Sequence, residues 1–297
     1  MSVALAPQVA TRVRRAEPLS RHTSWHVGGP ADVFFNPRDR EELAAFLRAA
    51  PAEVPIHWIG LGSNLLVRDG GLRGIVISTH GTLDALERLS ETCVRGEAGV
   101  ACARIARQCI RWGLGPAEFF AGIPGTLGGA LAMNAGAFGG ETWAHVRALE
   151  TIDRRGRTLR RLPSEYRVGY REVIAPADDE WFISAELTFE RRPGAHAGEV
   201  QKLLEQRKAS QPIGEWSCGS VFTNPVGDHA ARLIEAAGLK GFRIGGASVS
   251  QKHANFIINH GQASAADLEH LIGHVRDTVA RLHGVALHPE VRIVGVP

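Results

Sequence analysis

Residues 119–140 form the longest stretch of this chain without a charged side chain, and seven of them are glycine. The stretch reads FFAGIPGTLGGALAMNAGAFGG. It is long enough to cross a bilayer, but a membrane helix rarely contains so many glycines together with a proline. Glycine lets the backbone approach a neighbour closely, at a cost in conformational entropy. We therefore predict buried loop structure here, either wrapped around a large flat ligand or packed in a close crossing of strands and helices.

The rest of the composition indicates an ordinary globular protein. Its 297 residues suit two or three subdomains, and the net charge of +3 is too small to indicate nucleic-acid binding. The N-terminus lacks the apolar run of a signal peptide. We therefore expect a cytoplasmic protein that binds neither nucleic acid nor membrane. No cysteine pair has CxxC spacing, which argues against a disulfide framework or a zinc site and favours a reducing compartment; the cysteines are Cys93, Cys102, Cys109 and Cys218.

Hydrophobic periodicity predicts a β-rich first part and helices near the C-terminus. Strands are expected in IHWIG, LLV and IVIS, with turns at GLGSN and DGGLRG. Asp39 with Glu42, and Ser264 with Asp267, have the spacing of helix N-terminal caps. The segment RRPGAHAG combines proline, glycine and charge without periodicity, so we place a domain boundary there.

Several short motifs have both a functional and a purely structural interpretation. The turn GLGSN offers backbone N–H groups and short donors to a phosphate, but a plain hairpin explains it equally well. The arginines of YRVGYRE could clamp a carboxylate, or they could lie on an exposed basic strand. Ser220 lacks the GxSxG context of a hydrolase nucleophile. The histidine pairs lack a third ligand nearby, so no metal site is expected; they are His22 with His26 and His283 with His288.

Together these motifs stand in one recognisable order, and the chain resembles the UDP-N-acetylenolpyruvoylglucosamine reductases over nearly its whole length. The resemblance rests on seven segments: HTSWHVGGPADVFF, IGLGSNLLVRDGGLRGIVI, GIPGTLGGALAMNAGAFGGE, YRVGYRE, SCGSVFTNP, AARLIEAAGLKGFRIGGASVSQKHANFIIN and HPEVRIVG. It implies an α+β fold, with a PCMH-type FAD-binding region of two subdomains followed by a C-terminal α/β substrate-binding domain. The expected boundaries are 21–190, dividing near 80, then 199–285, with a tail at 286–297 returning to the first subdomain.

The resemblance also implies a reaction and the residues that perform it. NADPH reduces non-covalently bound FAD, and the reduced flavin then reduces the enolpyruvyl group of UDP-N-acetylglucosamine enolpyruvate for peptidoglycan synthesis. By motif match Ser220 is the proton donor, while Arg171 and Glu290 stabilise the enol intermediate. Expected substrate contacts are Tyr170, Asn224, Lys252 and His253. Expected FAD contacts are Gly60, Gly62, Ser63, Asn64, Leu65, Gly122, Ile123, Pro124, Gly125, Thr126, Gly128, Gly129, Asn134 and Gly136.

The chain departs from the family pattern at a few points. No tyrosine follows Tyr170, so the chain resembles the shorter branch that lacks a tyrosine-bearing lid loop. Thr223 stands where lysine is common, and Leu61 replaces a small or polar residue in the GLGSN turn. Two other functions stay open, a PCMH-type FAD oxidase and a non-catalytic nucleotide-binding module. We expect a small UDP-sugar substrate and no obligate protein partner.

Overall fold

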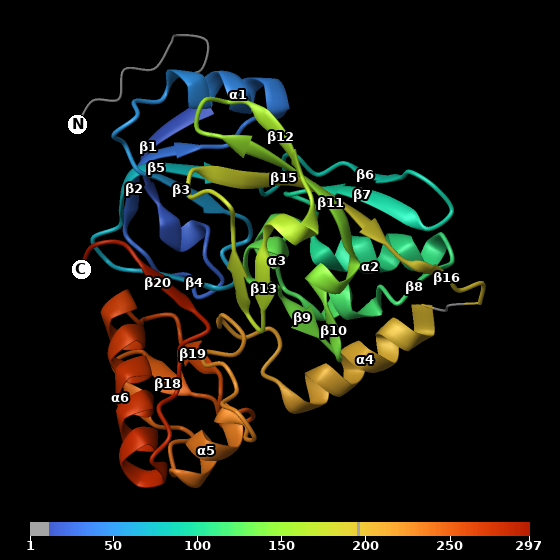
Figure 1. The fold of residues 1–297 in the computed structure, drawn as a ribbon. Helices are drawn as coiled ribbons and strands as arrows, with labels where there is room; N and C mark the ends of the chain where they lie inside the picture. The colour runs from blue at the N-terminus through green and yellow to red at the C-terminus, as the bar shows by residue number, and fades with distance from the viewer. Residues whose placement is uncertain (1–11, 195–196) are drawn as a thin grey trace. The chain divides into compact units, whose positions relative to one another are not determined.

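The structure is a computed structural model that describes residues 12–194 and 197–297, and the chain folds into two compact units (Figure 1). Unit 1 contains residues 34–60 and 75–205, with the described residues before 15. Unit 2 contains residues 15–33, 61–74 and 206–297. Each unit therefore combines segments that are far apart in the sequence.

Unit 1 is built on a five-stranded antiparallel sheet of order β12-β11-β15-β7-β6. Helices α2 and α3 lie on the same side of this sheet (Figure 1). Apolar side chains from the sheet and from both helices form one buried cluster, because each element has one apolar face to remove from water. The elements are β6 (Leu86–Arg88), β7 (Cys93–Glu97), α2 (Cys102–Arg111), α3 (Leu127–Met133), β11 (Val146–Asp153), β12 (Thr158–Arg161) and β15 (Glu180–Thr188).

A four-stranded sheet of order β1-β2-β5-β3 accompanies helix α1, and the boundary between the units falls within β1, β2 and β5. The side chain of Asp39 accepts a 2.8 Å hydrogen bond from the backbone N–H of Glu42, so the predicted cap of α1 is confirmed. Phe46 of this helix stacks on Phe35, with ring centroids 3.9 Å apart. The elements are β1 (Val13–Pro18), β2 (Pro30–Phe35), α1 (Arg40–Ala49), β3 (Ile56–Ile59) and β5 (Leu72–Ser78).

The prediction of loop structure throughout residues 119–140 is wrong, because the short helix α3 occupies the middle of the stretch. A Cβ atom at Gly128 would lie 3.0 Å from Cβ of Ala98, so glycine lets α3 pack against that residue. The backbone N–H of Leu127 donates a 2.8 Å hydrogen bond to Val100. Close packing against the protein thus explains part of the glycine content. Flanking α3 are the 3₁₀ helix η3 (Glu118–Gly122) and strands β9 (Gly136–Ala137) and β10 (Gly140–Glu141).

Unit 2 contains a three-stranded antiparallel sheet of order β17-β18-β19 that packs with α5 and α6 around one apolar core. Ser264 accepts a 3.0 Å hydrogen bond from the N–H of Asp267, which confirms the predicted cap of α6. The C-terminal strand β20 pairs in parallel with β4. The elements are β4 (Leu65–Val67), α5 (Ala230–Ala236), β17 (Arg243–Ile244), β18 (Ala247–Val249), β19 (Ile257–Asn259), α6 (Ala265–His283) and β20 (Arg292–Val294).

The remaining elements are short, apart from one helix. Strands β13 and β14 form an antiparallel hairpin in unit 1, and β8 pairs with β16. Helix α4 continues from unit 1 into unit 2. These elements are η2 (Leu19–Arg21), β8 (Leu114–Gly115), η4 (Thr142–His145), η5 (Pro163–Glu165), β13 (Arg167–Gly169), β14 (Glu172–Ile174), β16 (Glu190–Arg191) and α4 (Ala197–Ser210).

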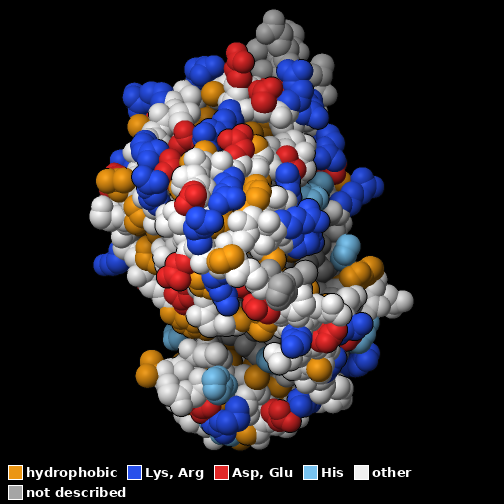
Figure 2. Space-filling model, turned by 90° about the vertical axis from the view of Figure 1, so that its right-hand side faces the viewer, with side chains coloured by type: hydrophobic (Ala, Val, Ile, Leu, Met, Phe, Trp, Pro, Cys, Tyr) orange, Lys and Arg blue, Asp and Glu red, His pale blue; other side chains and the backbone are white. Residues whose placement is uncertain are grey.

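The surface carries charges of both signs. Figure 2 shows Lys and Arg side chains interspersed with Asp and Glu on the face drawn, as expected for a small net charge. Across residues 12–194 and 197–297, no helix combines the length and the apolar character needed to span a bilayer.

Candidate functional site

The GLGSN segment forms a tight turn between β3 and β4, as predicted. Gly62 has φ +60°, and a Cβ atom there would lie 2.0 Å from the carbonyl oxygen of His22. The amide of Asn64 donates a 3.0 Å hydrogen bond to the carbonyl of Glu290, and the N–H of Arg292 donates to the carbonyl of Asn64 at 3.0 Å. Asn64 therefore joins the turn to the C-terminal segment within unit 2. Ser63 is half-buried, and Leu65 begins β4.

In unit 1, Gly60 lies directly against Thr126. A Cβ atom at Gly60 would lie 2.3 Å from Thr126 Oγ1, so only glycine fits there without a shift. Thr126 is 1% exposed, and its hydroxyl has no hydrogen-bond partner among the described residues. A buried hydroxyl without a partner costs about 1–3 kcal/mol, so native proteins usually supply one. Thr126 Oγ1 is therefore available to a polar group of a bound ligand.

The glycines of the 122–140 stretch fall into two groups. A Cβ atom at Gly122 would lie 2.5 Å from Cβ of Ala137, and a Cβ atom at Gly136 would lie 2.3 Å from the carbonyl oxygen of Gly140. Protein packing therefore requires both glycines. At Gly129 the nearest atom would be 3.9 Å away, so packing leaves that glycine unexplained. Among the other predicted cofactor contacts on this stretch, Pro124 and Gly129 are exposed, Gly125 and Gly128 are half-buried, and Ile123 is buried.

Tyr170 and Arg171 form the two-residue turn of the β13–β14 hairpin. Arg171 has φ +57°, an unfavourable backbone conformation for any residue other than glycine. Its guanidinium donates to the carbonyls of Asn134 at 3.3 Å and Gly136 at 3.1 Å, and it lies 4.9 Å from the ring centroid of Tyr170. The alternative of an exposed basic strand is therefore wrong at Arg171. This residue lies in a turn, and its guanidinium is bonded to two carbonyls.

Ser220 and Glu290 are brought together in unit 2 although they are far apart in the sequence. The N–H of Glu290 donates a 2.8 Å hydrogen bond to the carbonyl of Val221, the residue after Ser220. Val221 in turn donates to the carbonyl of Asn255 at 2.9 Å. Gly219 has φ +81°, which turns the chain immediately before Ser220. The backbone is thus held by hydrogen bonds directly after Ser220. Arg171 belongs to unit 1.

Asn255 helps to hold the segment that follows Ser220, and sequence reasoning missed this residue. Its side chain accepts a 3.0 Å hydrogen bond from the N–H of Phe222 and donates a 2.8 Å bond to the carbonyl of Phe222. It is 4% exposed and follows the predicted substrate contact His253 by two positions. An amide side chain in the otherwise apolar run ANFII was the available signal, because a buried amide needs hydrogen-bond partners.

The predicted substrate contacts in unit 2 are held in different ways. The side chain of Asn224 accepts a 3.1 Å hydrogen bond from the N–H of Ala230, the first residue of α5. The ammonium of Lys252 donates to the carbonyl of Lys208. Burial, together with the charge of Lys240, lowers the pKa of His253, and its buried Nδ1 has no partner among the described residues. His253 therefore keeps a neutral imidazole nitrogen available for a ligand.

The cysteine thiols are buried, and that of Cys218 lies near Glu290. All four cysteines are free and buried. Burial and then the negative charge of Glu290 raise the pKa of the Cys218 thiol well above its usual value, so this thiol stays protonated beside the carboxylate. Among the residues that the structure describes, no three His, Cys, Asp or Glu side chains converge on a metal position.

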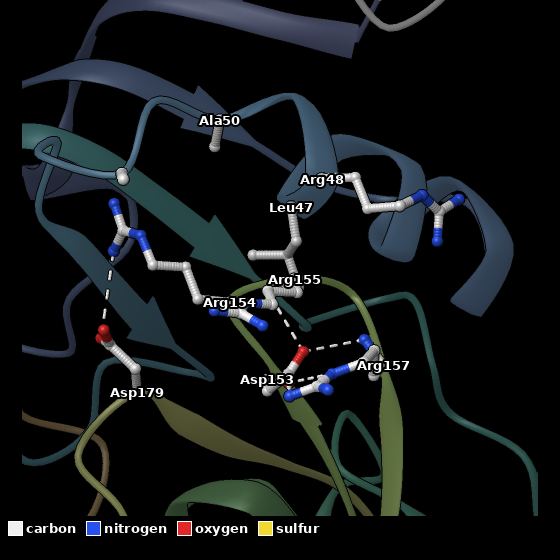
Figure 3. A pocket seen from close by; sticks show the side chains of 9 residues that line it. Leu47, Arg48, Ala50, Asp153, Arg154, Arg155, Arg157 and Asp179 are labelled. Carbon is white, nitrogen blue, oxygen red and sulfur yellow. Dashed lines mark hydrogen bonds and ion pairs between the residues drawn. The ribbon is translucent and has the colours of Figure 1, made fainter.

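A pocket of about 890 Å³ lies elsewhere in unit 1, near the C-terminal end of α1 and the β11–β12 turn (Figure 3). None of the predicted site residues lines it. Arg157 pairs with Asp153 at 2.7 Å, and Arg154 reaches toward Asp179 at 3.9 Å. The lining residues are Leu47, Arg48, Ala50, Ala52, Asp153, Arg154, Arg155, Arg157 and Asp179.

Comparison with known proteins accounts for both parts of the chain. Residues 31–161 match the family model described as FAD binding domain, and residues 211–294 match that of the UDP-N-acetylenolpyruvoylglucosamine reductase C-terminal domain. The reductase of that name from Alkalilimnicola ehrlichii is 63% identical, with 95% of each chain covered. The one from Coxiella burnetii is 49% identical, with 94% of each chain covered.

A solved structure supports the same assignment. The crystal structure of UDP-N-acetylenolpyruvylglucosamine reductase from Thermus caldophilus aligns with a TM-score of 0.80 at 33% identity, covering 95% of this chain and 98% of that one. The predicted α+β fold, a PCMH-type FAD-binding region with a C-terminal domain, is confirmed. On sequence identity, coverage and fold together, this chain belongs to the UDP-N-acetylenolpyruvoylglucosamine reductase family.

Proposed function

We propose that Arg171, Ser220 and Glu290 are the residues with which this FAD-dependent oxidoreductase reduces UDP-N-acetylglucosamine enolpyruvate to UDP-N-acetylmuramate. FAD, when bound, would supply the hydride that comes from NADPH and is added to the methylene carbon of the enolpyruvyl group. One proton must then reach the neighbouring carbon to complete the lactyl ether. The observation that carries the proposal is the hydrogen bond from Glu290 N–H to the Val221 carbonyl, which joins the Ser220 and Glu290 motifs.

Ser220 is the proposed proton donor. A serine hydroxyl is a weak acid, so it donates efficiently only when its position is fixed and a partner compensates the charge it develops. The bonds of Val221 to Asn255 and Glu290 hold the backbone directly after Ser220, and Gly219 turns the chain directly before it. With the neighbouring backbone held in this way, the Ser220 hydroxyl is the group that we propose donates the proton.

Arg171 and Glu290 are proposed to balance charge on the substrate. Hydride addition at the methylene carbon leaves negative charge on the neighbouring carbon and the adjoining carboxylate, which a guanidinium stabilises. The Glu290 carboxylate would have to take up a proton before it could donate a hydrogen bond to the same substrate carboxylate. The left-handed backbone of Arg171 supports this role, because strained residues persist where the surrounding structure holds them for function.

The residues that would hold FAD come from the GLGSN turn and the 122–129 segment. Thr126 supplies a buried hydroxyl that has no partner within residues 12–194 and 197–297, and Gly60 and Gly129 remove side chains beside it. Backbone N–H groups of the turn suit the pyrophosphate, because glycine lets them approach an anion closely. Tyr170, Asn224, Lys252 and His253 remain the proposed substrate contacts. We also place the protein in the cytoplasm and require no protein partner for the reaction.

The deciding experiment is an anaerobic visible spectrum of the purified protein. NADPH should bleach the yellow flavin, and UDP-N-acetylglucosamine enolpyruvate alone should restore its colour. If only oxygen restores the colour, the protein acts as an oxidase. A colourless protein that takes up no FAD would instead support a binding module.

A further inference from the structure

The side chain of Asn134 is engaged on every polar atom by this chain itself. Its amide nitrogen donates to the carbonyl of Gly169 and to Oε2 of Glu141, both at 3.0 Å. Its amide oxygen accepts a 3.1 Å hydrogen bond from the N–H of Trp143. Rotating the amide by 180° would set donors against Trp143 and acceptors against the other two, so only one orientation fits. The side chain is therefore satisfied by protein contacts alone and does not need the FAD contact that the family resemblance implies for Asn134.

The backbone of Asn134 adds a second link to the β13–β14 hairpin. Its carbonyl accepts a 3.3 Å hydrogen bond from the guanidinium of Arg171, and the carbonyl of Gly136 accepts another at 3.1 Å. Asn134 itself has φ +46° as the residue that ends α3, and it is 3% exposed. Asn134 is thus hydrogen-bonded to the hairpin at two points. One is Gly169, the last residue before the turn, and the other is Arg171, the second residue of the turn.

We infer that Asn134 is a positioning residue that sets the guanidinium of Arg171 for the reduction of the enolpyruvyl group. This inference rests on the catalytic role proposed for Arg171. Two bonds from one buried residue constrain both the backbone and the side chain of the turn, and a turn in a strained conformation needs such support. Displacing a charge-stabilising group by about 1 Å costs up to about 100-fold in rate.

Replacement by glycine provides a clean test. Asn134→Gly removes all three side-chain hydrogen bonds yet retains the left-handed backbone, which glycine adopts without strain. In the FAD-loaded protein, reduction of flavin by NADPH should change by less than about twofold. Reoxidation by the enolpyruvyl substrate should slow about 10- to 100-fold, with little change in substrate affinity. Amide hydrogen exchange in residues 167–174 should accelerate.

Two further variants separate positioning from general stabilisation. Asn134→Asp combined with Glu141→Gln restores the link to residue 141 and the acceptor for Trp143, but not the donor to Gly169. It should recover only part of the thermal stability, because a carboxylate then faces the Gly169 carbonyl, and none of the reoxidation rate. Asn36→Ala is the matched control, because Asn36 also donates to two carbonyls in unit 1, Ser78 at 2.9 Å and His80 at 3.2 Å. It should leave both half-reactions unchanged.

A double-mutant cycle with Arg171→Ala completes the test. If Asn134 acts through Arg171, then Asn134→Gly should slow reoxidation no further in the Arg171→Ala background. Equal slowing of both half-reactions, loss of FAD, or recovery of the rate in the Asn134→Asp/Glu141→Gln variant would overturn the positioning role. Normal reoxidation in Arg171→Ala alone would instead reject the proposed catalytic role of Arg171.

Discussion

The backbone N–H of Glu290 donates a 2.8 Å hydrogen bond to the carbonyl of Val221, so the C-terminal segment runs beside the segment that carries Ser220. A second backbone bond, from Thr223 to His288 at 2.9 Å, extends this pairing, and a third, from Arg292 to Asn64 at 3.0 Å, joins the C-terminal segment to the GLGSN turn. Because these bonds involve only the backbone, side-chain substitutions at Ser220 or Glu290 should leave the local fold intact. The chemistry of each side chain can therefore be tested separately.

Ser220→Ala should bind FAD and be reduced by NADPH at the normal rate. Reoxidation by UDP-N-acetylglucosamine enolpyruvate should slow by about 100- to 10,000-fold, the usual contribution of a general acid. Stopped-flow absorbance of the flavin measures both half-reactions. Ser217→Ala is the control, since it removes a hydroxyl three positions away and should change neither rate. Equal losses in both half-reactions would rule out a proton-donor role.

Thr126→Val should weaken FAD binding while leaving the FAD-free protein at least as stable as the parent. The Thr126 hydroxyl is buried without a partner in the described part of the chain, so a methyl group of similar size removes a desolvation penalty from the empty protein. In the holoprotein the same change would remove the hydrogen bond that we propose Thr126 makes to the cofactor. Thermal unfolding with and without FAD, together with a flavin titration, measures both effects. Unchanged FAD affinity would show that Thr126 does not contact the cofactor.

Gly62→Ala should destabilise the protein more than Gly81→Ala does. Both residues have positive φ, so each substitution carries a backbone cost of about 1–2 kcal/mol. A Cβ atom at Gly81 meets nothing within 4 Å, whereas at Gly62 it would lie 2.0 Å from the carbonyl of His22. The clash should add roughly 1–3 kcal/mol and reduce the FAD content. Urea unfolding of both variants gives the difference, and equal costs would contradict the close approach.

The free energy of unfolding should fall as the pH is lowered from 4.5 toward 2, in part because of Glu150. Burial opposes ionisation of this carboxyl, but hydrogen bonds from Ser184 and Arg40 and the nearby charge of Arg95 lower its pKa from 4.5 to about 2. A lowered folded-state pKa contributes stability above the unfolded value and loses it below the folded value.

Glu150→Gln should therefore cost about 1–2 kcal/mol at pH 7 and progressively less below pH 4.5, allowing for the 28% exposure of the side chain. Denaturant unfolding at several pH values measures the dependence. Glu186→Gln serves as the comparison, since Glu186 pairs with Arg160, which is 58% exposed, and should cost less. A pH-independent loss in Glu150→Gln would contradict the lowered pKa.

Features that depend on neighbours in the sequence were predictable. The caps at Asp39 and Ser264 each join residues three positions apart, so spacing alone identified them. The order of the seven motifs likewise sufficed to identify the family, and the comparisons confirmed it.

Features that depend on distant residues were not predictable from patterns. Helix α3 lies within a stretch that was predicted as loop. Its Gly128 packs against Ala98, and no periodicity in the sequence reports that contact. Asn255 escaped notice because its partner, Phe222, lies 33 positions away.

The sequence by itself determined the helix caps, the GLGSN turn and the family to which the chain belongs, because short-range spacing and motif order are written directly in it. Only the tertiary structure decided which glycines are required by packing, that the buried Thr126 hydroxyl has no partner among the described residues, and that Asn134 holds the turn at Arg171. Each of these features depends on which distant residues the folded chain brings into contact, and no pattern along the sequence specifies those contacts.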